Sequence, residues 1–211
     1  ELSYFGAKVI HPYTMIPAVE HGIPVRIRNT FNPNGPGTWI RETRGESGPR
    51  MATGIASVEN VALINIEGGG MVGLPGVASK VFTALAHAGV NIIMISQASS
   101  EHSICVVCRQ EQASAALASL RVELATELAS KKIQRFELLE DLEIVAVIGE
   151  RMRGTPGISA RVFGALGEER INVLAIAQGS SEMNISFVVH GADRERTLQV
   201  VHRAFFVPEA S

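Results

Sequence analysis

The sequence predicts an α+β fold in which two copies of one βαββαβ module are joined, the first inserted into the second. The chain repeats itself: after a shift of 81 residues, 17 of the 49 residue pairs between 61–109 and 142–190 are identical. Within each copy, short apolar runs typical of strands alternate with two segments of helical periodicity. The second copy ends before its fourth strand, and a strand-like run lies upstream of the first copy. A repeat with one strand displaced toward the start of the chain indicates an insertion.

In the first copy, an apolar strand is followed by a glycine-rich turn and a helix. Pro75 suits the first turn of this helix, and Gly89 is typical of the residue just beyond a helix end. A polar turn at 98–102 separates the next two strands, and a segment rich in Ala, Leu and Glu predicts the second helix. Strands are expected over 61–67, 90–96, 103–108 and 133–139, and helices over 75–88 and 111–130. This order is the ferredoxin-like topology, with an antiparallel sheet and helices on one face.

The second copy follows the same order but is one strand short. Strands are expected over 142–148, 171–178 and 184–189, and helices over 156–169 and 194–205. The run 25–30 alternates apolar and polar residues, so we expect it to complete the second sheet. Residues 6–21 predict a short helix kinked by Pro12 and Pro17, and 41–54 predict a solvated linker. The expected division is a connector over 1–24, the completing strand plus linker over 25–60, the first module over 61–141 and the second over 142–211 together with 25–30.

Composition narrows the class of protein. Charged residues make up 19% of the 211 residues, below the roughly one quarter of an average globular chain, and the formal net charge is −2. This balance argues against a disordered chain and gives no basic surface for a nucleic-acid backbone. The sequence shows neither the roughly 18 consecutive apolar residues of a membrane span nor a signal-peptide pattern. We therefore expect no nucleic-acid or membrane partner, a cytoplasmic location, and some apolar surface that meets another subunit.

Two cysteines, Cys105 and Cys108, form a C-x-x-C motif of the kind found in metal and redox sites. They lie in a predicted strand, where side chains alternate between faces, so residues three apart point in opposite directions. No second Cys or His pair lies at ligand spacing in the sequence. We therefore expect reduced cysteines that fill space in the strand, and no metal ion.

The segment 68–73 matches the pattern G-x-G-x-x-G directly after a predicted strand, which is typical of dinucleotide-binding turns. Three observations count against that use. The helix begins two residues later at Pro75, the neighbouring strands are antiparallel, and no carboxylate for a ribose lies about 20 residues further on. The matching segment 149–154 also lacks the middle glycine. A nucleotide-binding enzyme fragment stays an alternative, which binding of NAD or ATP to this loop would reveal.

The same loops suit a small zwitterionic ligand. Unpaired N–H groups at a helix N-terminus attract a carboxylate, so residues 73–77 are a candidate carboxylate site. Asn91 offers an amide to the ammonium group, and Gln97, an even number of residues along the same strand, offers one to the ligand side chain. A plainer interpretation, a turn-capping Asn and a solvated Gln, is disfavoured because both residues recur in both copies. The candidate binding residues are Met71, Gly73, Pro75, Gly76, Val77, Asn91, Ile92 and Gln97 in the first copy, and Gly154, Pro156, Gly157, Asn172 and Gln178 in the second.

Nothing in the sequence resembles a catalytic site. Ser99, Glu101 and His102 supply the residue types of a hydrolytic triad, but adjacent residues of one turn cannot converge on one point. The six histidines are scattered, without helical ligand spacing. We therefore expect this chain to bind a ligand without catalysing a reaction, and to carry no cofactor of its own.

Two decapeptides carry a resemblance to a known family. The segments 95–104 (ISQASSEHSI) and 176–185 (IAQGSSEMNI) resemble the tandem ACT regulatory domains of aspartokinases, in particular the threonine-sensitive type found in bifunctional aspartokinase–homoserine dehydrogenases. Residues 5–12 (FGAKVIHP) are similar to the end of the kinase domain, and 27–38 to its link into the regulatory region. The resemblance covers essentially the whole chain.

The resemblance implies an allosteric role. The full-length enzyme would phosphorylate the side-chain carboxylate of aspartate with ATP, and an end-product amino acid would inhibit it through the ACT modules. In threonine-sensitive relatives a glutamine of each module contacts the effector, which here corresponds to Gln97 and Gln178. Lysine-sensitive relatives carry an acidic residue where this chain has Ile95, so threonine is favoured over lysine as the effector.

The resemblance also implies partners. ATP would belong to a kinase domain in cis, whose motifs would lie N-terminal to Glu1. Two or more copies of the chain would associate through the edges of their ACT sheets, as a homodimer or higher oligomer. Two alternatives stay open: an ACT dimerisation module that has lost its ligand, and a lysine-responsive regulatory domain.

Overall fold

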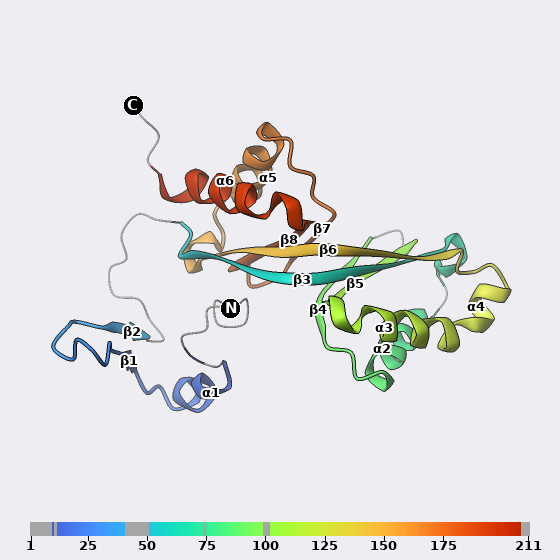
Figure 1. Cartoon of the computed structure of the whole chain (residues 1–211), viewed down its shortest axis with the longest axis horizontal. Helices are drawn as coiled ribbons and strands as arrows, with labels where there is room; N and C mark the ends of the chain where they lie inside the picture. The colour runs from blue at the N-terminus through green and yellow to red at the C-terminus, as the bar shows by residue number, and fades with distance from the viewer. Residues whose placement is uncertain (1–9, 11, 41–50, 74, 99–101, 208–211) are drawn as a thin grey trace.

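The computed structural model describes residues 10, 12–40, 51–73, 75–98 and 102–207 (Figure 1). Residues 1–9 of the expected connector and 41–50 of the expected linker lie outside the described residues. The chain begins with helix α1 (Pro12–Glu20), which contains Pro17, and a hairpin of strands β1 (Val25–Ile27) and β2 (Thr38–Ile40). These elements lie apart from the main sheet, so the two predicted modules occupy the chain from residue 51 onward.

The main sheet has six antiparallel strands in the order β4-β5-β3-β6-β8-β7. Its two central strands, β3 (Gly54–Glu67) and β6 (Arg135–Ile148), are each 14 residues long and run through both modules. Strands β4 (Ile92–Gln97) and β5 (Ser103–Arg109) complete the first module, and β7 (Ala175–Gln178) and β8 (Asn184–His190) complete the second. The two ferredoxin-like modules are confirmed, and they share one continuous sheet.

The run 25–30 does not complete the second module, and that prediction was wrong. Val25 pairs with Ile40 in the separate hairpin, while Gly54 pairs with Ile148 of the second module and Val58 with Ile144. The first half of β3 is therefore the missing fourth strand, and the first module is indeed inserted into the second. Pairing of β1 with β2 closes only a short loop, which costs less chain entropy than crossing to a distant sheet. Residues 54–58 reach β6 because they extend the strand predicted over 61–67 toward its N-terminus.

Each long strand changes module at an irregular point. Asn60 and Asp141, which match each other in the repeat, both have left-handed backbone conformations, with φ of 56° and 55°. The register between β3 and β6 shifts between Val58 and Val61, as at a β-bulge. The side chain of Gln110 fixes the second of these points, since its Oε1 accepts the Asp141 N–H at 2.8 Å. The repeat therefore extends to the joints between modules.

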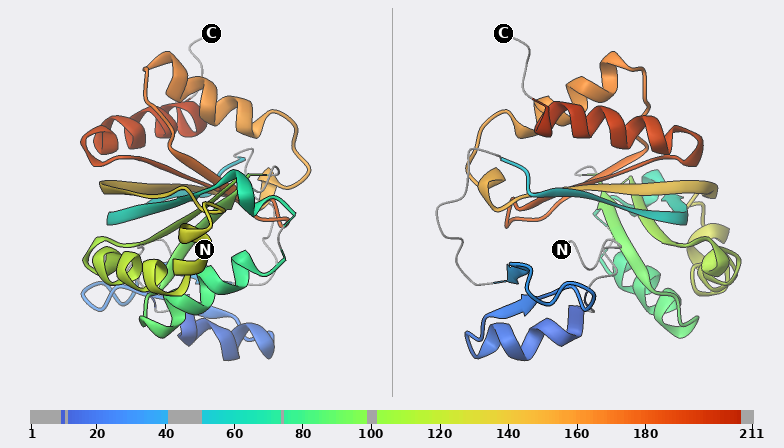
Figure 2. Two further views of the ribbon diagram at one scale, coloured as in Figure 1. Left: turned by 90° about the vertical axis from the view of Figure 1, so that its right-hand side faces the viewer. Right: turned by 60° about the vertical axis from the view of Figure 1, so that its left-hand side comes forward.

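Helices cover the sheet on two outer sides (Figures 1 and 2). Helices α2 (Val77–His87), α3 (Gln110–Glu123) and α4 (Ala125–Ala129) belong to the first module, and α5 (Ile158–Glu168) and α6 (Arg194–Phe206) to the second. The predicted helix 111–130 is two helices, because the backbone leaves helical geometry at Leu124. Short 3₁₀ turns follow β3, β6 and β8 at Gly69–Met71, Glu150–Met152 and Gly191–Asp193.

Three clusters of buried side chains hold these layers together. Ala62, Ile64 and Ile66 of β3 pack under α2 and α3, and Val145 and Val147 of β6 pack under α5 and α6. The alternate residues of the same strands join a third cluster with side chains from β4, β5, β7 and β8. The sheet curls so that its end strands β4 and β7 meet, where Ser96 Oγ donates to the Ile176 carbonyl at 2.9 Å. The helix-free sides of the two modules thus enclose a common core.

Candidate functional site

The glycine loop of the first module is shaped by packing. A Cβ at Gly68 would overlap the carbonyl oxygen of Lys132, and one at Gly70 would lie 2.6 Å from the Lys132 Cα. In the second module a Cβ at Gly149 would likewise overlap the carbonyl oxygen of Met51. These glycines let another backbone segment approach closely. The G-x-G pattern therefore has a structural cause that involves no nucleotide.

Two further glycines position the start of helix α2. Gly76 is the N-cap residue with φ of 92°, and Gly73 has φ of 64°, conformations that side chains other than glycine rarely adopt. Gly76 itself has no side chain with which to cap this N-terminus. The matching residues Gly157 and Gly154, with φ of 88° and 66°, repeat the arrangement before α5. Both helices therefore present their first N–H groups toward the loop.

A pocket of about 210 Å³ lies at the start of α2. Met71, Val77 and Ile104 are buried and form an apolar floor, while Gln97 at the end of β4 is exposed. The pocket thus combines a helix N-terminus, one neutral amide and an apolar surface, which suits a small amino acid with a short side chain. The residues that line it are Met71, Pro75, Gly76, Val77, Ala78, Gln97 and Ile104.

Five of the eight residues predicted for the first module line this pocket, and Gly73, Asn91 and Ile92 do not. Asn91 precedes β4, exposed, with its backbone N–H on Gln112 Oε1 at 3.3 Å. An extended strand rises about 3.3 Å per residue, so Asn91 and Gln97 lie roughly 20 Å apart along one chain. The structure therefore does not bring Asn91 and Gln97 of one chain around the same small ligand.

Two lining residues, Ala78 and Ile104, were not predicted. Ile104 pairs directly with Gln97 across β4 and β5. The signal for Ile104 was present, since it ends the decapeptide 95–104 that repeats as 176–185. Ala78 lies one residue beyond the predicted Val77 in the first turn of α2.

In the second module the corresponding loop is held by a carboxylate of the chain itself. The Gly154 N–H donates to Glu182 Oε2 at 2.7 Å. Pro156 and Gly157 are exposed beside it, and Gln178 is exposed at the end of β7. Asn172 is exposed and precedes β7, as Asn91 precedes β4. The predicted residues of the second module thus lie in the loop before α5 and around β7, as those of the first lie around α2 and β4.

An ion pair supports the helix that lines the first pocket. Lys80 Nζ of α2 lies 2.6 Å from Glu127 Oε1 of α4, and Glu127 is only 7% exposed. The hydrogen bond from Lys80 is the main cause that lowers the pKa of Glu127, against the opposing effect of burial. A second pair, Arg135 with Glu67 at 2.6 Å, lowers the pKa of Glu67 in the same way.

The two cysteines do not form a joint site. Cys108 packs in the core of the first module under its helices, whereas Cys105 packs toward the common core and donates to Asn65 Oδ1 at 3.2 Å. Burial raises the pKa of both thiols, which keeps them protonated and unreactive. The described part of the chain holds no cluster of three His, Cys, Asp or Glu side chains placed to bind a metal ion.

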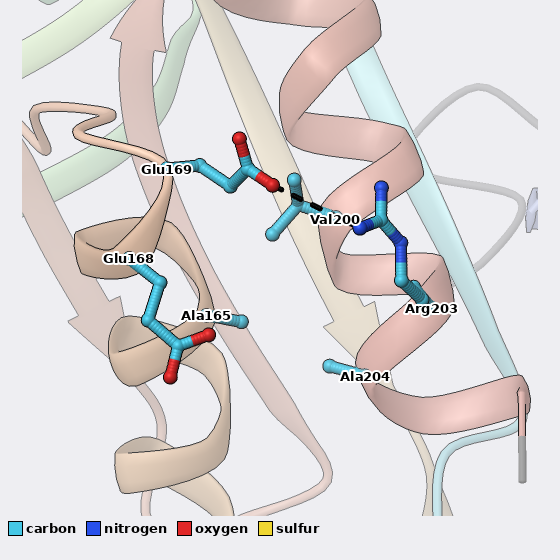
Figure 3. Close-up of a pocket in the computed structure, with 6 residues that line it drawn as sticks. All are labelled: Ala165, Glu168, Glu169, Val200, Arg203 and Ala204. Atoms are coloured by element: carbon cyan, nitrogen blue, oxygen red, sulfur yellow. Dashed lines mark ion pairs between the residues drawn. The ribbon is translucent and has the colours of Figure 1, made fainter. Parts of the chain in front are cut away.

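A second hollow, of about 160 Å³, lies between α5 and α6 (Figure 3). Ala165, Val200 and Ala204 form its apolar part, and Arg203 Nη1 lies 3.8 Å from Glu169 Oε1 across it. None of the predicted binding residues lies there. Among the described helices, none is long and apolar enough to cross a membrane.

Comparison with known proteins shows which family this chain resembles. The model of the ACT domain matches residues 64–124 and 145–205, one match in each module. The bifunctional aspartokinase/homoserine dehydrogenase 1 of Arabidopsis thaliana is 44% identical over 98% of this chain. That alignment spans only 23% of the Arabidopsis protein.

Solved structures agree with this match. The aspartate kinase of Clostridium acetobutylicum superimposes with a TM-score of 0.84 at 30% identity, over 97% of this chain and 46% of the kinase chain. Aspartokinase III of E. coli, in a complex with lysine and aspartate described as the T-state, superimposes with a TM-score of 0.76 at 30% identity, over 98% and 44%. The chain therefore belongs to the ACT domain family, and it carries two ACT domains in tandem.

Proposed function

We propose that this chain is the regulatory region of an aspartokinase and that it binds an end-product amino acid, threonine in first place, to inhibit the kinase. The observation that carries the proposal is the pocket of the first module, where the N-terminus of α2 and the amide of Gln97 flank an apolar floor. A carboxylate would lie at the helix N-terminus, and a hydroxyl would exchange hydrogen bonds with Gln97. A methyl group would lie on Met71 and Val77.

Inhibition would follow from differential binding. An effector that fits the pocket in only one arrangement of the modules shifts the equilibrium toward that arrangement, by as much as its affinities for the two states differ. The shared strands β3 and β6 connect the two modules directly, so a change at one pocket reaches the other module through continuous backbone. Kinase activity, with ATP and aspartate as substrates, would belong to another domain of the same polypeptide.

Lysine is the second candidate effector, because the E. coli relative was solved in a complex with lysine and aspartate. Position 95 favours threonine. Ile95 lies on β4 two residues before Gln97 with 44% of its surface exposed, and it offers a lysine ammonium group no charge partner. Among the described residues that line the pocket, none carries a charge that would complement a lysine side chain.

We propose further that two copies associate through β4. This strand lies at one end of the sheet, and within the described chain its backbone ladder pairs only with β5. It also meets β7 at the hydrogen bond between Ser96 and Ile176, a contact that pairing with a second copy would displace. An antiparallel pairing centred on Met94 would set Asn91 of one copy opposite Gln97 of the other. The predicted constellation of Asn91 and Gln97 would then form between subunits, although one chain holds the two residues far apart.

Calorimetric titration of the whole chain with threonine, lysine, methionine and isoleucine tests the effector. We expect heat with threonine and weaker heat with lysine. Gln97→Ala should weaken threonine binding about tenfold, because the ligand hydroxyl loses its partner. Gln199→Ala, which removes an exposed amide from α6, is the matched control and should bind as the wild type does. Absence of heat with all four amino acids at millimolar concentration would overturn the proposal.

A further inference from the structure

The turn between β7 and β8 is fastened to the glycine loop of the second module at two points. The Gly149 N–H donates to the Met183 carbonyl at 2.9 Å, and the Gly154 N–H donates to Glu182 Oε2 at 2.7 Å. The first contact has a counterpart in the first module, where the Gly68 N–H donates to the His102 carbonyl at 3.0 Å. Glu101, which matches Glu182 in the repeat, lies outside the described residues.

The second contact involves the N–H group of Gly154, one of the candidate binding residues of the second module. Gly154 opens the segment 154–158, which corresponds in the repeat to the candidate carboxylate site at 73–77 of the first module. No atom lies within 4 Å of a Cβ built at Gly154 or Gly157, so their surroundings are open to solvent. A hydrogen bond from an N–H group to an ionised carboxylate is short and roughly twice as strong as one between neutral groups. Glu182 therefore occupies, from within the chain, a position that suits the carboxylate of an amino acid.

The backbone directs Glu182 into this position. Its φ is 56°, a left-handed conformation that is uncommon for residues other than glycine, and its N–H donates to the Gly179 carbonyl at 3.0 Å. The turn therefore holds Glu182 in a backbone conformation of higher energy, and this conformation places the side chain against the loop. Glu182 is nevertheless exposed, so its carboxylate can move into water without leaving a buried group behind.

We propose that Glu182 is an internal competitor for the effector at the second module. The inference rests on the proposed function and adds to it a control of affinity at that site. An amino acid binds there only when the Glu182 side chain has left Gly154, so the apparent dissociation constant is the intrinsic one divided by the fraction of molecules that are open. The competitor and the ligand present the same group, a carboxylate, to the same N–H.

The test measures threonine binding by calorimetry in a Gln97→Ala background, which reduces the contribution of the first module. We compare Gln97→Ala alone with Gln97→Ala/Glu182→Ala and with Gln97→Ala/Glu168→Ala. Glu168 is an exposed carboxylate at the other end of α5, so the control removes the same charge about 15 Å from the loop. A chemical-shift measurement on the Gly154 amide, before and after Glu182→Ala, reports the contact independently.

We expect Glu182→Ala to tighten threonine binding on the order of tenfold and to shift the Gly154 amide, and Glu168→Ala to do neither. Unchanged or weaker binding in Glu182→Ala overturns the inference, since a residue that contacts the effector or only shapes the loop would weaken binding when it is removed. Absence of binding in wild type and variants alike would overturn the proposed function as well. Binding in wild type with no gain from Glu182→Ala would overturn this inference alone.

Discussion

Glu127 shows how one residue links stability to the shape of the pocket. The residue is only 7% exposed, its carboxylate meets Lys80 at 2.6 Å, and its backbone carbonyl accepts the N–H groups of Lys132 and Ile133. Its second carboxylate oxygen has no hydrogen-bond partner among the described residues. Lys80 belongs to the helix whose first turn lines the pocket, and Lys132 packs on the glycine loop. Glu127 therefore holds together the three segments that surround the binding loop.

Replacing Lys80 should destabilise the fold, because Glu127 is buried. Lys80→Met leaves the Glu127 carboxylate buried without its partner, and we expect a loss of about 1–3 kcal/mol in the free energy of unfolding at pH 7, measured by urea denaturation. Arg203→Met breaks an exposed pair with Glu169 at 3.8 Å and should cost less than about 1 kcal/mol. Equal losses in the two variants would contradict the prediction.

Acid should remove the contribution of this ion pair. The pKa of Glu127 is lowered in the folded state, so its stabilisation is complete above the pKa of the unfolded chain and is lost as the pH falls through the folded value. We expect the stability difference between wild type and Glu127→Gln to be largest near neutral pH and to shrink on acidification. A difference that stayed constant between pH 7 and pH 3 would contradict this sign.

At the scale of elements, the repeat predicted the order of strands and helices because both copies show the same periodicities. It did not predict which segment closes the second sheet. The run 25–30 alternates as an edge strand should, but it pairs with Thr38–Ile40. Nothing in the local pattern distinguishes this partner from the sheet of the second module. The periodicity likewise predicts that Leu124 is helical, although the backbone leaves helical geometry there between α3 and α4. The local sequence thus predicts the helices and strands well, but it predicts the pairing between distant strands poorly.

Truncation tests the strand that closes the second module. Removal of residues 1–50 deletes α1, β1 and β2 but keeps Gly54–Val58, and we expect the remaining chain to unfold cooperatively, with little change in melting temperature of the second module. Removal of residues 1–60 also deletes the strand paired with Val145–Ile148 and should unfold that module. Circular dichroism with thermal melting measures both. If the shorter truncation already unfolds the second module, the hairpin of β1 and β2 is required after all.

At the scale of the whole molecule, the distance spanned by β4 explains what sequence reasoning missed at the site. The predicted set of Asn91 and Gln97 rested on alternation, which places two residues on one face but says nothing about the distance along the strand. In the folded chain these residues lie at opposite ends of β4. Ile95 and Ile176 are equivalent in the repeat, lie on the two end strands and are exposed at 44% and 45%.

Association through β4 would bring Asn91 and Gln97 of two copies together and would cover Ile95, and it can be tested with one substitution. Ile95→Asp places a charge on β4, which we expect to pair with β4 of a second copy. It should therefore shift the chain toward monomer in sedimentation velocity. It should also weaken threonine binding, because the partner's Asn91 is lost from the pocket. Val122→Asp, on α3 and 79% exposed, adds the same charge away from β4 and should change neither measurement. A monomeric Ile95→Asp chain that binds threonine normally would show that each pocket is complete within one chain. A wild-type chain that stays monomeric at high concentration would overturn the association itself.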